Sequence, residues 1–211
     1  MKTRTTTYIA LMVALLIVLG FIPGIPLGFI PVPIVLQNLG VMLAGALLGS
    51  RKGFLAVAIF LLLVAIGAPF LPGGRSGLVT LFGPTAGYLL TYPFAAFFIG
   101  LGLEKVKTTK LWVQFLIIWI FGVLLIDICG SIVLSFQTSL PLTKSLFSNL
   151  IFIPGDTLKA SICLIIYRKF ANSIEHHFAN ISIIFNTIYH YASPSRLPVI
   201  EKSTHLAIFT V

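Results

Sequence analysis

Long apolar runs separated by short polar loops are the feature that most restricts what this chain can fold into. Apolar residues make up 58% of the sequence and charged residues only 9%, against about half and about a quarter in an ordinary soluble domain. A single core in a chain of 211 residues could not hide that much apolar surface from water. The sequence therefore predicts a membrane protein and disfavours a soluble enzyme, a nucleic-acid-binding protein or a disordered chain.

Six stretches are candidate membrane spans, because an apolar helix crosses the hydrocarbon core in about 20 residues. They are residues 8–22, 34–49, 53–67, 84–103, 111–136 and 151–167, of which the second and third are short. We interpret the first as a retained helix and not a signal peptide, since no cleavage-like site follows it. The expected fold is an all-α bundle of six transmembrane helices over residues 1–170. A divergent tail follows at 171–211, to which the sequence assigns no role.

The basic residues predict the orientation of this bundle. The chain has 14 Lys and Arg against 5 Asp and Glu, a net charge of +9. Loops on the side of the N-terminus hold nine of them, and loops on the other side hold two, Arg75 and Lys144. The nine are Lys2, Arg4, Arg51, Lys52, Lys105, Lys107, Lys110, Arg168 and Lys169. Because cytoplasmic loops are enriched in Lys and Arg, both ends of the bundle are expected in the cytoplasm. The charge forms no stripe or recognition motif, which argues against nucleic acid as a partner.

Ionisable residues at membrane depth point to a ligand site, because they are unfavourable there unless paired or hydrated. Asp156 and Lys159 are three residues apart, so a helix that begins near Pro154 and Gly155 places both side chains on one face. They can form a purely structural pair, or present an acceptor and a donor to a ligand. Asp127, near the middle of the fifth span, can pair with a lysine or contact a ligand, and the sequence leaves its role open.

Arg75 lies in a glycine-rich loop between the third and fourth spans. Gly73 and Gly74 permit positive φ angles, so their N–H groups can form an anion-binding nest beside the guanidinium of Arg75. The alternative is a flexible exposed turn. The sequence thus offers a cation and a set of backbone donors that suit a carboxylate.

The stretch 83–88, with the sequence GPTAGY, opens the fourth span. Pro84 suits the first position of a helix, Thr85 can satisfy local backbone donors, and Tyr88 offers an apolar ring with one polar tip. The stretch lacks the Lys-Ser/Thr ending of a P-loop, so it does not predict nucleotide binding by that mechanism. Gln37 is a further polar candidate, at the start of the second span.

No metal site or resident cofactor is predicted. Cys129 and Cys163 are single residues within apolar runs, without paired spacing. The adjacent His176 and His177 lack a carboxylate or cysteine at ligand spacing.

Five stretches together resemble the BioY family, the biotin-specific substrate-binding (S) components of energy-coupling factor (ECF) transporters. They occur in the family's order and are 8–14 (YIALMVA), 30–37 (IPVPIVLQ), 73–77 (GGRSG), 83–88 (GPTAGY) and 152–159 (FIPGDTLK). The resemblance implies a biotin pocket near the outer face of a six-helix bundle. It implies as partners a transmembrane coupling subunit, which docks at Ala10 and Ala14 of the first helix, and paired cytoplasmic ATPases. The chain carries no ATP-binding motif of its own, and residues 171–211 have no counterpart in this resemblance.

With biotin as ligand, each polar candidate receives an expected partner. Asp156 and Lys159 supply an acceptor and a donor for the ureido group, and Arg75 with its glycines suits the carboxylate. Tyr88 belongs to the apolar wall, and Thr85 and Gln37 are further contacts. The reverse assignment, with Lys159 on the carboxylate, stays open.

Two other functions are alternatives. An S component for another small vitamin fits the same residues. An intramembrane aspartyl protease is disfavoured, because Ile126 precedes Asp127 where such enzymes have Tyr. Ile153 also stands where their Gly-x-Gly-Asp signature needs glycine. The chain is therefore expected to bind and transport, and no catalytic residue is assigned.

Overall fold

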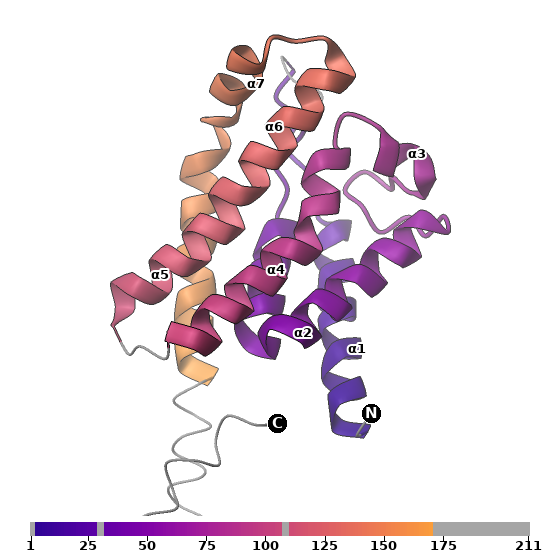
Figure 1. Ribbon diagram of the computed structural model, residues 1–211. Helices are drawn as coiled ribbons and strands as arrows, with labels where there is room; N and C mark the ends of the chain where they lie inside the picture. The colour runs from indigo at the N-terminus through magenta and orange to yellow at the C-terminus, as the bar shows by residue number, and fades with distance from the viewer. Residues whose placement is uncertain (1–2, 29–31, 107–109, 171–211) are drawn as a thin grey trace, which may run out of the picture. The chain divides into compact units, whose positions relative to one another are not determined.

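The structure, a computed structural model, describes residues 3–28, 32–106 and 110–170. Regular structure in these ranges is helical apart from two isolated β-bridges (Figure 1), which confirms the all-α expectation. The helices are α1 (Thr3–Phe21), α2 (Gln37–Ala65), α3 (Gly77–Phe82), α4 (Ala86–Val106), α5 (Leu111–Trp119), α6 (Leu125–Thr138), α7 (Leu142–Asn149) and a last helix, Phe152–Phe170. A π-helical turn, η1 (Ile120–Leu124), joins α5 to α6. The tail predicted at 171–211 lies outside the described residues.

Helix α2 consists of two helices that meet at a break. Gly49 has φ +77° and ψ −177°, a conformation that essentially only glycine adopts. A Cβ built on Gly53 would lie 2.6 Å from the carbonyl oxygen of Ala44. In a continuous helix those two residues would be about 13 Å apart, so the chain folds back at Gly49. The second and third predicted spans accordingly correspond to the two short helices on either side of this break.

Glu104, near the end of α4, fixes this break. Its two carboxylate oxygens accept hydrogen bonds from the backbone N–H and the hydroxyl of Ser50, each over 2.8 Å. Ser50 begins the second half of α2, where the first N–H groups have no partner inside the helix. Glu104 therefore caps that half-helix from a different element. Gly100, one turn earlier on α4, lies directly against the backbone of Gly49 and Ser50.

The core lies between α2 and α4, the pair of helices in most extensive contact. Gly45 of α2 lies against the backbone of Ala96, so the two helices approach closely. Helix α1 packs on α2 by placing Leu16 and Leu19 over Gly40. These contacts hold the N-terminal half of the bundle together through small residues.

By length and composition alone, three helices of the described part could cross a membrane, with α2 counted as one despite its break, and a bent pair is a possible fourth span. They are Gln37–Ala65, Ala86–Val106 and Leu111–Thr138, with Leu142–Asn149 and Phe152–Phe170 as the pair, bent by 48°. The predicted spans 84–103 and 111–136 match two of these within three residues.

Four local predictions are corrected. The segments 68–83 and 137–150, which lie between predicted spans and were expected to be loops, contain helices α3 and α7. Helix α4 begins at Ala86, because Pro84 and Thr85 lie in a turn closed by the Ala86 N–H on the Gly83 carbonyl at 2.9 Å. The last helix begins at Phe152, so Asp156 lies past the first turn and not at the helix start. Pro154 fits there because the first turn needs no N–H donors.

Candidate functional site

A cavity lies where the extended segment before α2 meets the start of α4 and the last helix. Its lining also includes the loop at Arg75 and one residue of α6, and the space inside, mouth included, is about 520 Å³. Six of the predicted site residues line it: Gln37, Arg75, Thr85, Tyr88, Asp156 and Lys159. Residues that are more than a hundred positions apart in the sequence thus meet around one cavity.

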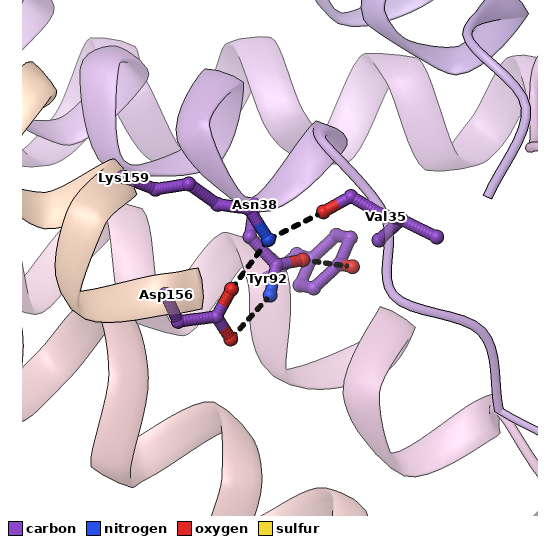
Figure 2. Close-up of polar contacts among 5 residues, drawn as sticks. All are labelled: Val35, Asn38, Tyr92, Asp156 and Lys159. Atoms are coloured by element: carbon purple, nitrogen blue, oxygen red, sulfur yellow. Dashed lines mark hydrogen bonds and ion pairs between the residues drawn. The ribbon is translucent and has the colours of Figure 1, made fainter. Parts of the chain in front are cut away.

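Asp156 and Lys159 form an ion pair of 2.5 Å in the cavity wall, and both side chains are less than a tenth exposed. Their predicted common helix face is confirmed. The Lys159 ammonium also donates to the Val35 carbonyl at 2.7 Å, and the Asn38 amide donates to Asp156 at 3.3 Å. The Tyr92 hydroxyl donates to Asn38 at 2.5 Å. Figure 2 shows these contacts converging from the last helix, the start of α2 and α4.

This network makes the burial of two charges tolerable, because each is hydrogen-bonded as well as paired. Lys159 uses two of its three N–H donors within the protein, and both oxygens of Asp156 accept. A ligand at this wall therefore meets one remaining donor of Lys159 and the unused lone pairs of Asp156.

Arg75 lines the cavity from its loop. Its Nε–H donates to the Pro72 carbonyl at 3.2 Å, a contact that does not use the two terminal nitrogens. Gly73 and Gly74 have φ values of +78° and +70°, as their expected turn conformation requires. They do not line the cavity, and the Gly74 N–H donates to the Leu71 carbonyl at 3.0 Å. The glycines thus shape the turn that presents Arg75.

Tyr88 contributes its ring to the cavity, while its polar tip is used inside the protein. The hydroxyl donates to Asn149 over 2.8 Å. The ring lies edge-on to Phe152 at a centroid distance of 6.4 Å and directly against Gly130. Tyr88 is therefore part of an apolar wall, held in place by its hydroxyl.

Gln37 and Thr85 border the cavity but bind the backbone. The Gln37 amide nitrogen donates to the Leu16 and Phe70 carbonyls at 3.2 and 2.9 Å, which uses both of its N–H groups. The Thr85 hydroxyl donates to the Thr80 carbonyl at 3.5 Å. The N–H groups of Gln37 and the hydroxyl of Thr85 thus donate to backbone carbonyls of other segments of the protein.

The sequence reasoning missed Asn38 and Tyr92. Both are buried and line the cavity. Asn38 was detectable as a second amide beside Gln37 at the start of an apolar run. Tyr92 follows Tyr88 by four residues, which places both on one helix face.

Asp127 lines the cavity from α6 and is 7% exposed. Among the described residues its Oδ2 has no hydrogen-bond partner, and no ion pair to a lysine is present there. The lysine pairing, one of the two alternatives open from the sequence, is therefore not observed in that part of the chain.

Ala10 and Ala14 lie outside the cavity, on the exposed face of α1. Leu11 beside them is 62% exposed. This face is available for a contact with another molecule.

The family model of the BioY family matches residues 1–176. The chain is 49% identical over 171 residues to "Biotin transporter BioY" of Lactococcus lactis subsp. cremoris (strain MG1363), which covers 80% of this chain and 90% of that protein. It is 41% identical over 175 residues to "Probable biotin transporter BioY" of Bacillus subtilis (strain 168), and the match covers 83% of this chain and 94% of that protein. The crystal structure of an S-component for biotin from an ECF-type ABC transporter matches with a TM-score of 0.79 at 47% identity, over 81% of this chain and 92% of that one. By sequence and by fold, the chain belongs to the BioY family.

Proposed function

We propose that this protein is the biotin-binding membrane subunit of a biotin uptake system, energised by an ECF coupling subunit and cytoplasmic ATPases. The observation that carries the proposal is the buried Asp156–Lys159 pair facing a cavity with Arg75, in a chain whose relatives are biotin transporters. No resident cofactor or metal is proposed, since biotin is the cargo.

The two ends of biotin are assigned by charge. The ureido group carries two N–H donors and a carbonyl acceptor, which suit the lone pairs of Asp156 and the remaining donor of Lys159. Lys159 is already paired with the Asp156 carboxylate, so the biotin carboxylate needs a different cation. It belongs at Arg75, whose terminal nitrogens form a planar fork. Tyr88 and Phe152 supply apolar surface for the rings and chain.

The proposed membrane arrangement has six spans with both ends of the bundle in the cytoplasm. The break at Gly49 supports it, because it divides α2 into two shorter helices. The other four proposed spans are α1, α4, the helix Leu111–Thr138 and the last helix, Phe152–Phe170. The excess of Lys and Arg in the loops of one side gives the orientation.

The coupling subunit is proposed to dock at Ala10 and Ala14. Both residues are exposed and lie one turn apart on α1. Small side chains at this spacing let another helix approach closely. Their position outside the cavity lets the partner bind while the ligand site is occupied.

Uptake of radiolabelled biotin tests the proposal in cells that lack their own importer, with and without a coupling module. We expect uptake with the wild-type protein and a loss of at least tenfold for Asp156→Asn, which weakens a hydrogen-bonded charged pair. Lys144→Ala, an exposed residue of α7 outside the cavity lining, is the matched control. A binding screen with purified protein separates biotin from other small vitamins. Absence of both uptake and binding would overturn the proposed function.

A further inference from the structure

Asp127 is a buried carboxyl group with an oxygen that the described part of the chain leaves without a hydrogen bond. It borders the cavity, is 7% exposed, and its Oδ2 has no hydrogen-bond partner among the described residues. A buried polar atom without a partner is destabilising, and a carboxyl group at membrane depth is a functional candidate for that reason. The partner of Asp127 is therefore to be sought in what fills the cavity.

The polar groups around Asp127 are already committed to one another. The Asn149 amide nitrogen donates to the Asp127 backbone carbonyl at 2.9 Å and to the Ser131 hydroxyl at 2.6 Å. Its two N–H groups are thereby used. The Tyr88 hydroxyl donates to the other end of the same amide. This network positions the backbone of α6 at Asp127 and leaves the side chain to the cavity.

The helix is also irregular just before this position. The π turn η1 ends at Leu124, three residues before Asp127. A π turn holds one residue more than an α turn. Because each helical residue turns by about 100°, the extra residue changes which side chain of the following helix faces a given neighbour. Such turns are frequent at functional sites. The direction of Asp127 thus depends on a local feature of the backbone.

The chemistry of the wall selects the group that meets Asp127. Asp127 and Asp156 both line the cavity, and a carboxyl oxygen without a partner, such as Oδ2 of Asp127, accepts a hydrogen bond from an N–H donor. Both oxygens of Asp156 already accept hydrogen bonds, from Lys159 and Asn38. We infer that Asp127 is a further ligand-contacting residue, which accepts a hydrogen bond from one ureido N–H of bound biotin. The inference rests on the proposed function and adds a second acceptor from a different helix.

Biotin binding to the purified full-length protein tests the inference. Asp127→Ala should weaken binding by about tenfold to a hundredfold, the range for leaving a buried N–H donor without its acceptor. Asp127→Asn, which keeps one acceptor oxygen, should lose less. The thermal midpoint without biotin should not fall for Asp127→Ala, because Oδ2 has no hydrogen bond to lose among the described residues. A structural residue would lower that midpoint.

Ser145→Ala is the matched control. Ser145 on α7 is fully buried and its hydroxyl lacks a partner among the described residues, as does Oδ2 of Asp127. It does not line the cavity. Removal of its hydroxyl should leave biotin affinity unchanged.

Biotin analogues methylated on one ureido nitrogen or the other identify the contact. Methylation of the nitrogen that faces Asp127 should weaken binding to the wild type at least tenfold and to Asp127→Ala less than about threefold, since the interaction is already absent. Wild-type affinity in Asp127→Ala, or equal losses for both proteins with both analogues, would overturn the inference and leave the proposed function intact. If the wild type bound no biotin, the inference about Asp127 and the proposed function would both be wrong.

Discussion

Glu104 accepts two hydrogen bonds from Ser50, one from its backbone N–H and one from its hydroxyl, across 54 positions of sequence. Glu104→Ala removes both acceptors and leaves the buried Ser50 unsatisfied at the start of a half-helix. We expect the free energy of unfolding to fall by about 1–3 kcal/mol. Thermal unfolding of the protein in detergent measures this.

Two further variants make that measurement specific. Glu104→Gln keeps one acceptor oxygen and should lose less stability than Glu104→Ala. Lys105→Ala, at the next exposed position, should leave the midpoint unchanged. The capping role is wrong if Glu104→Ala unfolds at the same temperature as Lys105→Ala.

Gly49→Ala should destabilise the bundle by about 1–3 kcal/mol, because the φ of +77° is strained for any residue with a Cβ. The added Cβ would also lie against the Glu104 carboxylate. Gly155→Ala is the control, since that glycine is helical and its Cβ position is open. Equal midpoints for the two variants would contradict the importance of the break.

Tyr88→Phe should affect stability more than biotin affinity. The variant keeps the ring in the cavity wall but leaves Asn149 Oδ1 without its donor, at an expected loss of about 1–3 kcal/mol. Thermal unfolding without ligand and equilibrium binding of biotin separate the two effects. A large loss of affinity with an unchanged unfolding midpoint would show that the hydroxyl meets the ligand instead.

Lys159→Met should be less stable than the double variant Asp156→Leu/Lys159→Met. The single change leaves a buried carboxylate without its cation, for an expected loss of about 3–5 kcal/mol. Replacement of both charges removes that penalty, although the double variant should not bind biotin. Unfolding in the absence of biotin gives the comparison. If the double variant were the less stable of the two, the pair would itself be a net source of stability.

Arg75→Ala should weaken the binding of biotin far more than that of biotin methyl ester. The ester lacks the negative charge that we assign to the Arg75 guanidinium. Competition with radiolabelled biotin measures both affinities. We expect Arg75→Ala to lose about tenfold or more in affinity for biotin and not for the ester. An equal loss for acid and ester would rule out this assignment and favour Lys159 as the partner of the carboxylate.

Local patterns were sufficient for the long apolar helices and for part of the site. Apolar length predicts the spans, and the spacing of Asp156 and Lys159 predicts their common face, because both depend on residues close in sequence. The break at Gly49 was not predictable in the same way, since a glycine within an apolar run is as common in an unbroken helix. Helix α7 was missed because its polar residues, Lys144 among them, made the segment read as a loop.

The remaining site contacts depend on the tertiary fold. No local rule pairs Asn38 with Asp156, which lies 118 positions further along the chain. The role of Asp127 was open for the same reason, since the identity of its neighbours is a property of the assembled bundle. Sequence patterns identify which polar groups need a partner, and only the packed helices determine which partner each finds.

The separation between Asn38 and Asp156 also sets an order of events during synthesis. At a typical elongation rate the ribosome needs about 6 to 24 s to make the 118 residues between them. Throughout that interval the nascent chain holds Asn38 without its carboxylate and Val35 without the Lys159 ammonium. The ligand pocket is therefore the last part of the bundle to be completed, and a chain that stalls before the final helix has no site to offer.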